Sequence, residues 1–162
     1  MLNISRRTVV FLVKEGKVLL GQRQRSSLGH LLWAGIGGKV EKGESIKEAA
    51  IREVKEEVGV DIQEENLKEM GEVFFEFPNK PKWSQKVAIF IAKRWQGEPK
   101  ESEEIKPAWF PIDNMPFEYM WPDAQFWIPL VLKNKTIKAH FVYDDSNVNL
   151  KKLGIEIIKF HI

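Results

Sequence analysis

Residues 38–60 constrain the fold of this chain more than any other stretch, because they combine clear helix boundaries with an unusual group of acidic residues. Glu44 or Ser45 can cap the first turn of a helix, and Glu48 follows Ser45 at the spacing of a capping box. Gly59 supplies the left-handed residue at which helices commonly end. The stretch therefore predicts one helix between these two boundaries.

The acidic residues of this helix are Glu53, Glu56 and Glu57, and they continue its apolar side. At roughly 100° per residue, Ile46, Ala49 and Ala50 fall within about 60° of Glu53, as do the other two glutamates. A run of charges is usually a solvated face. Here three like charges repel one another at a helix C-terminus, where the dipole prefers cations. The cluster therefore predicts function, and its oxygen ligands suit Mg²⁺, which Mn²⁺ can replace, bound together with a substrate phosphate.

Composition narrows the class of protein. With 162 residues, the chain is predicted to be a single domain spanning residues 1–162. A net charge of +2 with interspersed acids and bases does not indicate a basic patch that would bind a nucleic-acid polymer. There is no cysteine and no apolar run long enough for a bilayer. We expect a soluble cytoplasmic protein that acts as a monomer, without a membrane partner.

Alternating apolar residues and turn signals predict the remaining elements. Residues 8–13 and 18–23 form a β-hairpin, a loop covers residues 24–30, and a glycine-rich turn at residues 33–39 leads into the helix. After the helix, strands are predicted at residues 73–77, 87–95, 108–111, 138–143 and 155–161. A second helix is predicted at residues 121–133, opened by Pro122.

The central stretch resembles the Nudix box, and it fits that signature at every fixed position. The matching residues are Gly38, Glu44, Arg52, Glu53, Val54, Glu56, Glu57, Gly59 and Val60. The resemblance implies an α+β protein with the Nudix fold, an α/β/α sandwich with a mixed β-sheet. It also implies hydrolysis of a nucleoside diphosphate linked to another group. The box glutamates and the Gly38 carbonyl would hold the metal, and Arg52 would orient one of the glutamates.

Motifs outside the box narrow the resemblance to the mammalian-type MutT homologues, which hydrolyse oxidised purine nucleoside triphosphates. The motifs are Trp33-x-Gly-x-Gly-Gly-Lys, Phe75-Glu76-Phe77, the acids around Glu101 to Glu104, Trp109-Phe110, Met120-Trp121-Pro122-Asp123 and Trp127-x-Pro129-Leu130. This resemblance implies hydrolysis of substrates such as 8-oxo-dGTP to the monophosphate and pyrophosphate. The cellular role would be sanitation of the nucleotide pool, which prevents DNA damage.

The same resemblance implies roles for single residues, each with a plainer alternative. Glu104 would join the metal cluster or lie near the attacking water, or it is a solvated acid. Trp121 would stack on the base, or it packs before a helix start. Phe75 and Phe77 would wall the base pocket, or they are core residues.

The remaining substrate-binding candidates lie at the base and the phosphates. Asp123 would accept from the N1–H and amine of a guanine edge, although an acid is also favoured in a first helical turn. Thr8 and Arg23 occupy positions near the base and the phosphates in the family, and Arg23 is otherwise a surface residue. Gly37 and Lys39 belong to the turn whose glycines allow a close approach of backbone to phosphate.

Two departures from the family pattern bear on the substrate. Ala34 replaces an Asn and Ala124 replaces a second Asp, two side chains that help the family read the oxidised base. We therefore expect a narrower or shifted choice of base with the hydrolytic machinery intact. An alternative is a pyrophosphohydrolase acting on an unmodified nucleotide or a dinucleoside polyphosphate. A catalytically silent nucleotide sensor is a further alternative, but it predicts erosion of the acidic cluster, which is complete here.

Overall fold

A mixed eight-stranded β-sheet forms the centre of the molecule in the computed structural model, which describes residues 4–24 and 31–160. Most of the predicted loop at residues 24–30 and the end of the predicted strand at residues 155–161 lie outside the described residues. The strand order is β3-β2-β1-β5-β4-β7-β8, and β6 pairs with β2. The strands are β1 (Ser5–Lys14), β2 (Lys17–Arg23), β3 (Trp33–Ala34), β4 (Leu67–Glu76), β5 (Gln85–Ala92), β6 (Ile105–Pro111), β7 (Lys135–Tyr143) and β8 (Leu150–Phe160).

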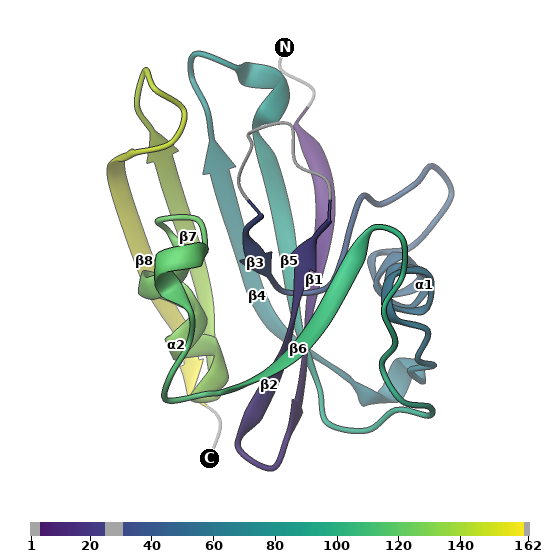
Figure 1. Cartoon of the computed structure of the whole chain (residues 1–162). Helices are drawn as coiled ribbons and strands as arrows, with labels where there is room; N and C mark the ends of the chain where they lie inside the picture. The colour runs from purple at the N-terminus through teal and green to yellow at the C-terminus, as the bar shows by residue number, and fades with distance from the viewer. Residues whose placement is uncertain (1–3, 25–30, 161–162) are drawn as a thin grey trace.

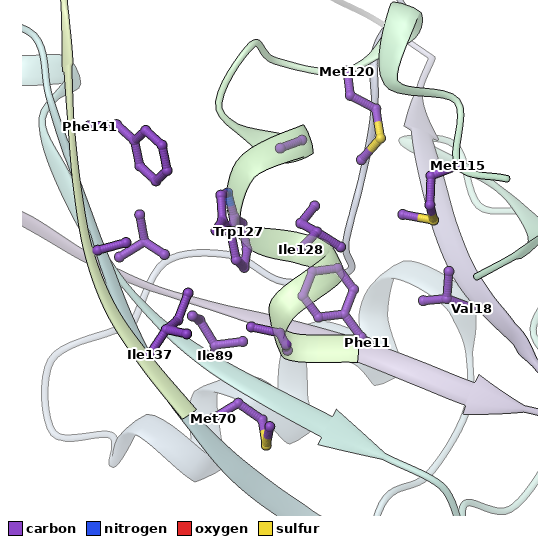
Figure 2. Packing of buried hydrophobic residues seen from close by; sticks show 14 of the residues in the cluster. Phe11, Val18, Met70, Ile89, Met115, Met120, Trp127, Ile128, Ile137 and Phe141 are labelled. Carbon is purple, nitrogen blue, oxygen red and sulfur yellow. The ribbon is translucent and has the colours of Figure 1, made fainter. Parts of the chain in front are cut away.

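Both faces of this sheet carry a hydrophobic cluster, and each cluster is covered by one helix (Figure 1). Side chains alternate between the faces of a strand, so Phe11 of β1 joins the cluster under α2 (Ala124–Leu132), whereas Val10 and Leu12 join the cluster under α1 (Ile46–Val58). Figure 2 shows Trp127 of α2 beside Phe11 within the first cluster. The predicted α/β/α sandwich with a mixed sheet is therefore confirmed.

The helix boundaries predicted in the central stretch are those observed for α1. The Ser45 hydroxyl accepts a hydrogen bond from the Glu48 N–H at 3.0 Å, and the Glu48 carboxylate accepts one from the Ser45 N–H at 3.1 Å. Gly59 ends the helix in the left-handed region with φ of 75°. The buried side of α1 includes Ala50, Val54 and also Glu57. The caps therefore fix which face of the helix, and which acid, turns inward.

The second helix is shorter than predicted and begins at Ala124 instead of residue 121. Trp121 precedes Pro122, and a residue before proline is pushed away from the helical region, so the helix cannot include it. Asp123 becomes the residue at the helix N-cap. The prediction of a helix that includes Trp121 was therefore wrong, and the segment before α2 is free to line a site.

Several strands differ from prediction in length, including β7 and β8, which begin at Lys135 and Leu150, before the predicted residues 138 and 155. β4 begins at Leu67, before the predicted residue 73, because a bulge between Glu69 and Glu72 interrupts its pairing with β5 and hides the alternation. β5 ends at Ala92, before the predicted residue 95, and β6 begins at Ile105, before the predicted residue 108. The β1–β2 hairpin is confirmed, with Lys14 paired to Lys17.

The tail strands complete the same sheet, since β7 pairs with β4 in parallel and β8 pairs with β7 in antiparallel orientation. Among residues 4–24 and 31–160, none of the helices has the length and apolar character needed to cross a membrane.

Candidate functional site

Arg52 is the centre of a network of ion pairs on α1. Its guanidinium binds Glu44 through two hydrogen bonds of 2.7 and 3.0 Å, and it reaches Glu53 at 3.0 Å and Glu56 at 3.2 Å. A further bond of 2.9 Å goes to the carbonyl of Lys39. Hydrogen bonding to Arg52 lowers the pKa of Glu44 to about 2, and the same bonds raise the pKa of Arg52. Arg52 therefore fixes the carboxylates around it, as an orienting role requires.

Gly38 lies directly against the carboxylate of Glu53. A Cβ added at Gly38 would stand 2.4 to 2.6 Å from the carboxyl atoms of Glu53, so any other residue would displace that side chain. The Gly38 carbonyl accepts hydrogen bonds from the N–H of Thr8 at 2.9 Å and from its hydroxyl at 3.5 Å. The glycine-rich turn and β1 therefore hold the box glutamate between them.

Glu57 is the buried acid of the cluster, with 6% of its surface exposed. Its carboxylate accepts a hydrogen bond of 3.4 Å from the N–H of Gly37. The pKa of Glu57 is raised to about 7, chiefly by burial and with smaller contributions from the negative charges of Glu53 and Glu104, while the charge of Arg23 acts in the opposite direction. The exposed Glu104 and the strand-end Arg23 therefore lie within electrostatic reach of the box.

The residues present fit a hard divalent cation by their chemistry. The donors are carboxylate oxygens on one rigid helix, and the charge of Glu53 adds to the cost of ionising Glu57, a cost that a cation would relieve. In the described part of the chain, no three acidic or histidine side chains form a ready-made metal site. Arg52 holds Glu53 and Glu56, while Glu57 binds Gly37.

A cavity of about 620 Å³ opens beside this network, on the face of the sheet that α2 covers. Its lining contains seven of the residues predicted to bind substrate, and the two alanines that depart from the family pattern also line it. These residues are Thr8, Arg23, Gly37, Phe75, Phe77, Trp121 and Asp123, with Ala34 and Ala124. Lys39 does not line the cavity; its carbonyl accepts a hydrogen bond from Arg52, and its backbone forms a β-bridge with Arg7.

Asp123 is the buried acid of the cavity, with 5% of its surface exposed. One carboxylate oxygen accepts a hydrogen bond of 2.8 Å from the Trp127 indole, and the other accepts a short one from the Tyr143 hydroxyl. Burial raises the pKa of Asp123, and these two bonds act in the opposite direction. Its side chain makes no capping hydrogen bond to α2. A role as a helix cap therefore does not explain why this acid is buried.

Aromatic side chains surround Asp123. Phe77 stacks on Tyr143 with centroids 4.7 Å apart and meets Trp121 edge-on at 6.0 Å. Phe75 stacks on Phe141 at 5.9 Å. Both phenylalanines also belong to or pack on the core cluster. Core packing of the two phenylalanines is therefore confirmed, and both also line the cavity, while their contact with a base stays a prediction.

The polar cavity residues to which sequence reasoning gave no role include Arg7 and Tyr143. Arg7 lies on β1 in step with Val9 and Phe11, so an arginine on the buried side of a strand was the available signal. Tyr143 ends a strand in the tail, and its contact with Asp123 joins residues 20 positions apart in the chain. No pattern in the sequence around Tyr143 predicts its contact with Asp123.

Comparison with known proteins decides the family. The model of the NUDIX domain matches residues 3–131 of this chain. The chain belongs to the NUDIX domain family. It is thus a Nudix hydrolase, and the family generally uses a divalent metal. Strands β7 and β8 follow the matched region and extend its sheet.

Relatives of this Nudix hydrolase agree with the resemblance drawn from the motifs. It is 40% identical over 153 residues to the oxidized purine nucleoside triphosphate hydrolase of Mus musculus, covering 94% of this chain and 96% of the mouse protein. The protein of the same name from Danio rerio is 41% identical over 141 residues, covering 87% and 88% of the two chains. A solved structure, the MutT mutator protein of Bacillus halodurans, is similar with a TM-score of 0.78 at 26% identity, covering 94% and 98%.

Proposed function

We propose that this Nudix hydrolase converts oxidised purine nucleoside triphosphates such as 8-oxo-dGTP to the monophosphate and pyrophosphate. The carrying observation is a buried carboxylate, Asp123, inside an aromatic cavity that adjoins the acidic network of α1. An arrangement of this kind suits a substrate with a purine at one end and phosphates at the other. The two relatives with 40% and 41% identity support the assignment through their names.

The acidic network would carry the hydrolysis. Mg²⁺, for which Mn²⁺ can substitute, would be held by Glu53, Glu56 and Glu57, with the carbonyl of Gly38 and with Glu104 as further donors. When bound, such a cation neutralises charge on phosphate oxygens and lowers the pKa of a water. Arg52 would keep the carboxylates of the helix in position through its hydrogen bonds to Glu53 and Glu56, and would itself bind no metal.

Two further observations bear on the donor set. The Gly38 carbonyl already accepts two hydrogen bonds from Thr8, so ligation by that carbonyl would displace the longer one, from the Thr8 hydroxyl. Glu57, with a pKa of about 7, is partly protonated at neutral pH and releases its proton when it binds a cation.

The cavity would choose the base. Trp127 and Tyr143 both donate to Asp123, and these bonds hold its carboxylate in one orientation. An ionised carboxylate can accept from both the N1–H and the exocyclic amine of a guanine. Trp121 and the two phenylalanines offer aromatic surface for the ring, with Thr8, Gly37 and Lys39 nearer the phosphates.

A second candidate keeps the chemistry and changes the substrate to an unmodified nucleotide or a dinucleoside polyphosphate. Ala34 and Ala124 favour it, because both line the cavity at positions where the family carries polar side chains. Losing one hydrogen bond to the base costs about 1 to 3 kcal/mol where its partner stays buried and dry.

The cellular role proposed for hydrolysis of oxidised purine nucleotides is to clear them before a polymerase incorporates them. Action as a cytoplasmic monomer stays a prediction.

The test is to identify the products formed from 8-oxo-dGTP with Mg²⁺. We expect 8-oxo-dGMP and pyrophosphate in equal amounts, with turnover lost when the cation is chelated and regained with Mn²⁺. Release of inorganic phosphate with the diphosphate would contradict the proposed bond cleavage. Tight binding without turnover of any nucleotide would instead identify a silent sensor.

A further inference from the structure

Arg7 lies on the cavity side of β1, although its neighbour Arg6 does not. Side chains alternate along a strand, so Arg7 shares its face with Ser5, Val9 and Phe11, and all four line the cavity. Arg6 is exposed and lines a second groove, which Arg7 also borders, but Arg6 does not line the cavity. Of the two adjacent arginines, only Arg7 therefore reaches the cavity.

A second arginine stands close to Arg7. Burial lowers the pKa of Arg7, and the positive charge of Arg23 lowers it further, whereas the negative charges of Glu53 and Glu57 raise it. Arg23 lines the same cavity. Among the described residues, no carboxylate forms an ion pair with either guanidinium within 4.0 Å. Arg52 is the opposite case, since it pairs with four glutamates.

Two like charges in a partly buried cavity repel each other, and an anion between them removes that cost. Their position indicates which anion. Arg7 lines the cavity that holds Asp123 at its buried end, and it also lies within reach of the charges of Glu53 and Glu57. In a nucleoside triphosphate, the group between the base and the two outer phosphates is the sugar with its α-phosphate.

We propose that Arg7 is a substrate-binding residue that acts with Arg23 to hold the α-phosphate, the phosphate that remains on the monophosphate product. This inference rests on the proposed function. A guanidinium presents a planar fork of donors that matches two phosphate oxygens, which a lysine cannot reproduce. Arg7 thereby ties the base cavity to the hydrolytic network, so that a nucleotide whose base is seated has its α-phosphate aligned.

The experiment compares the binding of 8-oxo-dGMP with that of 8-oxo-deoxyguanosine, and dGMP with deoxyguanosine, by calorimetry in the presence of EDTA. The proteins are the wild type, Arg7→Gln, Arg7→Lys and the matched control Arg6→Gln. The measured quantity is the ratio of the two dissociation constants in each pair, which reports what the phosphate adds. Thermal unfolding of each variant shows whether it is folded.

The wild type is expected to bind each monophosphate more tightly than its nucleoside. Arg7→Gln should reduce that ratio by about 10- to 100-fold without changing nucleoside affinity, because a charge-assisted hydrogen-bond pair is lost. Arg7→Lys should recover part of the ratio, and Arg6→Gln should keep it. Product inhibition by the monophosphate should weaken in parallel in Arg7→Gln.

An equal loss of nucleoside and monophosphate binding in Arg7→Gln would overturn the inference, since it would assign Arg7 to the shape of the cavity. An unchanged ratio would overturn it as well, as would a wild type for which the phosphate adds nothing. Failure of the proposed function would give a different result. In that case the wild type would still bind the monophosphates but would release no pyrophosphate from oxidised purine triphosphates.

Discussion

The acidic network of α1 and the cavity beneath α2 are built in opposite ways. Arg52, Glu44, Glu53 and Glu56 all come from one continuous stretch, and their contacts span eight residues of sequence at most. Asp123 is held by Tyr143 of β7, and the cavity around it also uses β1, β3 and β4. The residues proposed to carry hydrolysis are therefore close together in the sequence, whereas those proposed to select the substrate lie on segments that only the folded chain brings together.

The two regions also differ in what controls their acids. Around Arg52, the carboxylates of Glu44, Glu53 and Glu56 are paired with a guanidinium, which lowers the pKa of Glu44 to about 2. Glu57 is the exception on α1, since it is buried and its pKa is raised to about 7. In the cavity, Asp123 is buried and faces neutral donors, and its pKa is raised. Each region should therefore respond to a different perturbation, and the predictions below follow from that contrast.

The largest effect is expected from Glu57→Gln. The substitution keeps the shape of the buried side chain but removes its charge, so kcat should fall by about a thousandfold or more, in line with losing a metal-dependent stabilisation of several kcal/mol. The fold should persist, as measured by thermal unfolding. Glu65→Gln, at an exposed acid, is the matched control and should be neutral. Full activity of Glu57→Gln would break the assignment of hydrolysis to α1.

Asp123→Asn should affect the cavity beneath α2, and with it the recognition of the base. The amide places a donor opposite the donors of Trp127 and Tyr143, and it cannot accept twice from a guanine edge. We expect kcat/KM for 8-oxo-dGTP to fall by about 10- to 100-fold, equivalent to about 1 to 3 kcal/mol. Asp113→Asn, at an exposed acid, is the control. An equal loss for every triphosphate tested would contradict a role in base choice.

A smaller effect is expected from pH. Because the pKa of Asp123 is raised, its carboxyl holds a proton to higher pH than an exposed aspartate does, and loses it as the pH rises. The ionised form accepts from guanine, and the protonated form donates to the N1 acceptor of an adenine. The ratio of kcat/KM for 8-oxo-dGTP over 8-oxo-dATP should therefore rise with pH, by up to about tenfold per unit below the pKa. Asp123→Asn should make the ratio flat.

The smallest effect on activity is expected from Ser45→Ala. The substitution removes the hydroxyl that accepts from the Glu48 N–H at the start of α1. Loss of such a cap lowers the free energy of unfolding by about 1 kcal/mol, measurable by urea denaturation. The glutamates lie two to three turns away, so kcat and base preference should be unchanged. A loss of turnover with native stability would show that the helix start is coupled to the site.

How far the sequence could predict each region follows from this contrast. The caps of α1 and the inward face of Glu57 are local properties, and both were predicted correctly from spacing. Glu56 was predicted on the same inward face but is exposed, because it lies about 100° around the helix from Glu57. The start of α2 was predicted wrongly because the effect of Pro122 on Trp121 was overlooked. The bonds from Trp127 and Tyr143 to Asp123 depend on how β7 meets the segment before α2, which no local pattern encodes.

The most direct test of this division is a competition between 8-oxo-dGTP and dGTP in one reaction, with pyrophosphate release and both monophosphates quantified. We predict a clear preference for 8-oxo-dGTP in the wild type. Because the two guanines share the N1–H and the exocyclic amine, Asp123→Asn should lower kcat/KM for both substrates while hydrolysis continues. Equal kcat/KM values for the two substrates in the wild type would contradict the account. Ala34 and Ala124 would then mark a cavity that serves a different nucleotide.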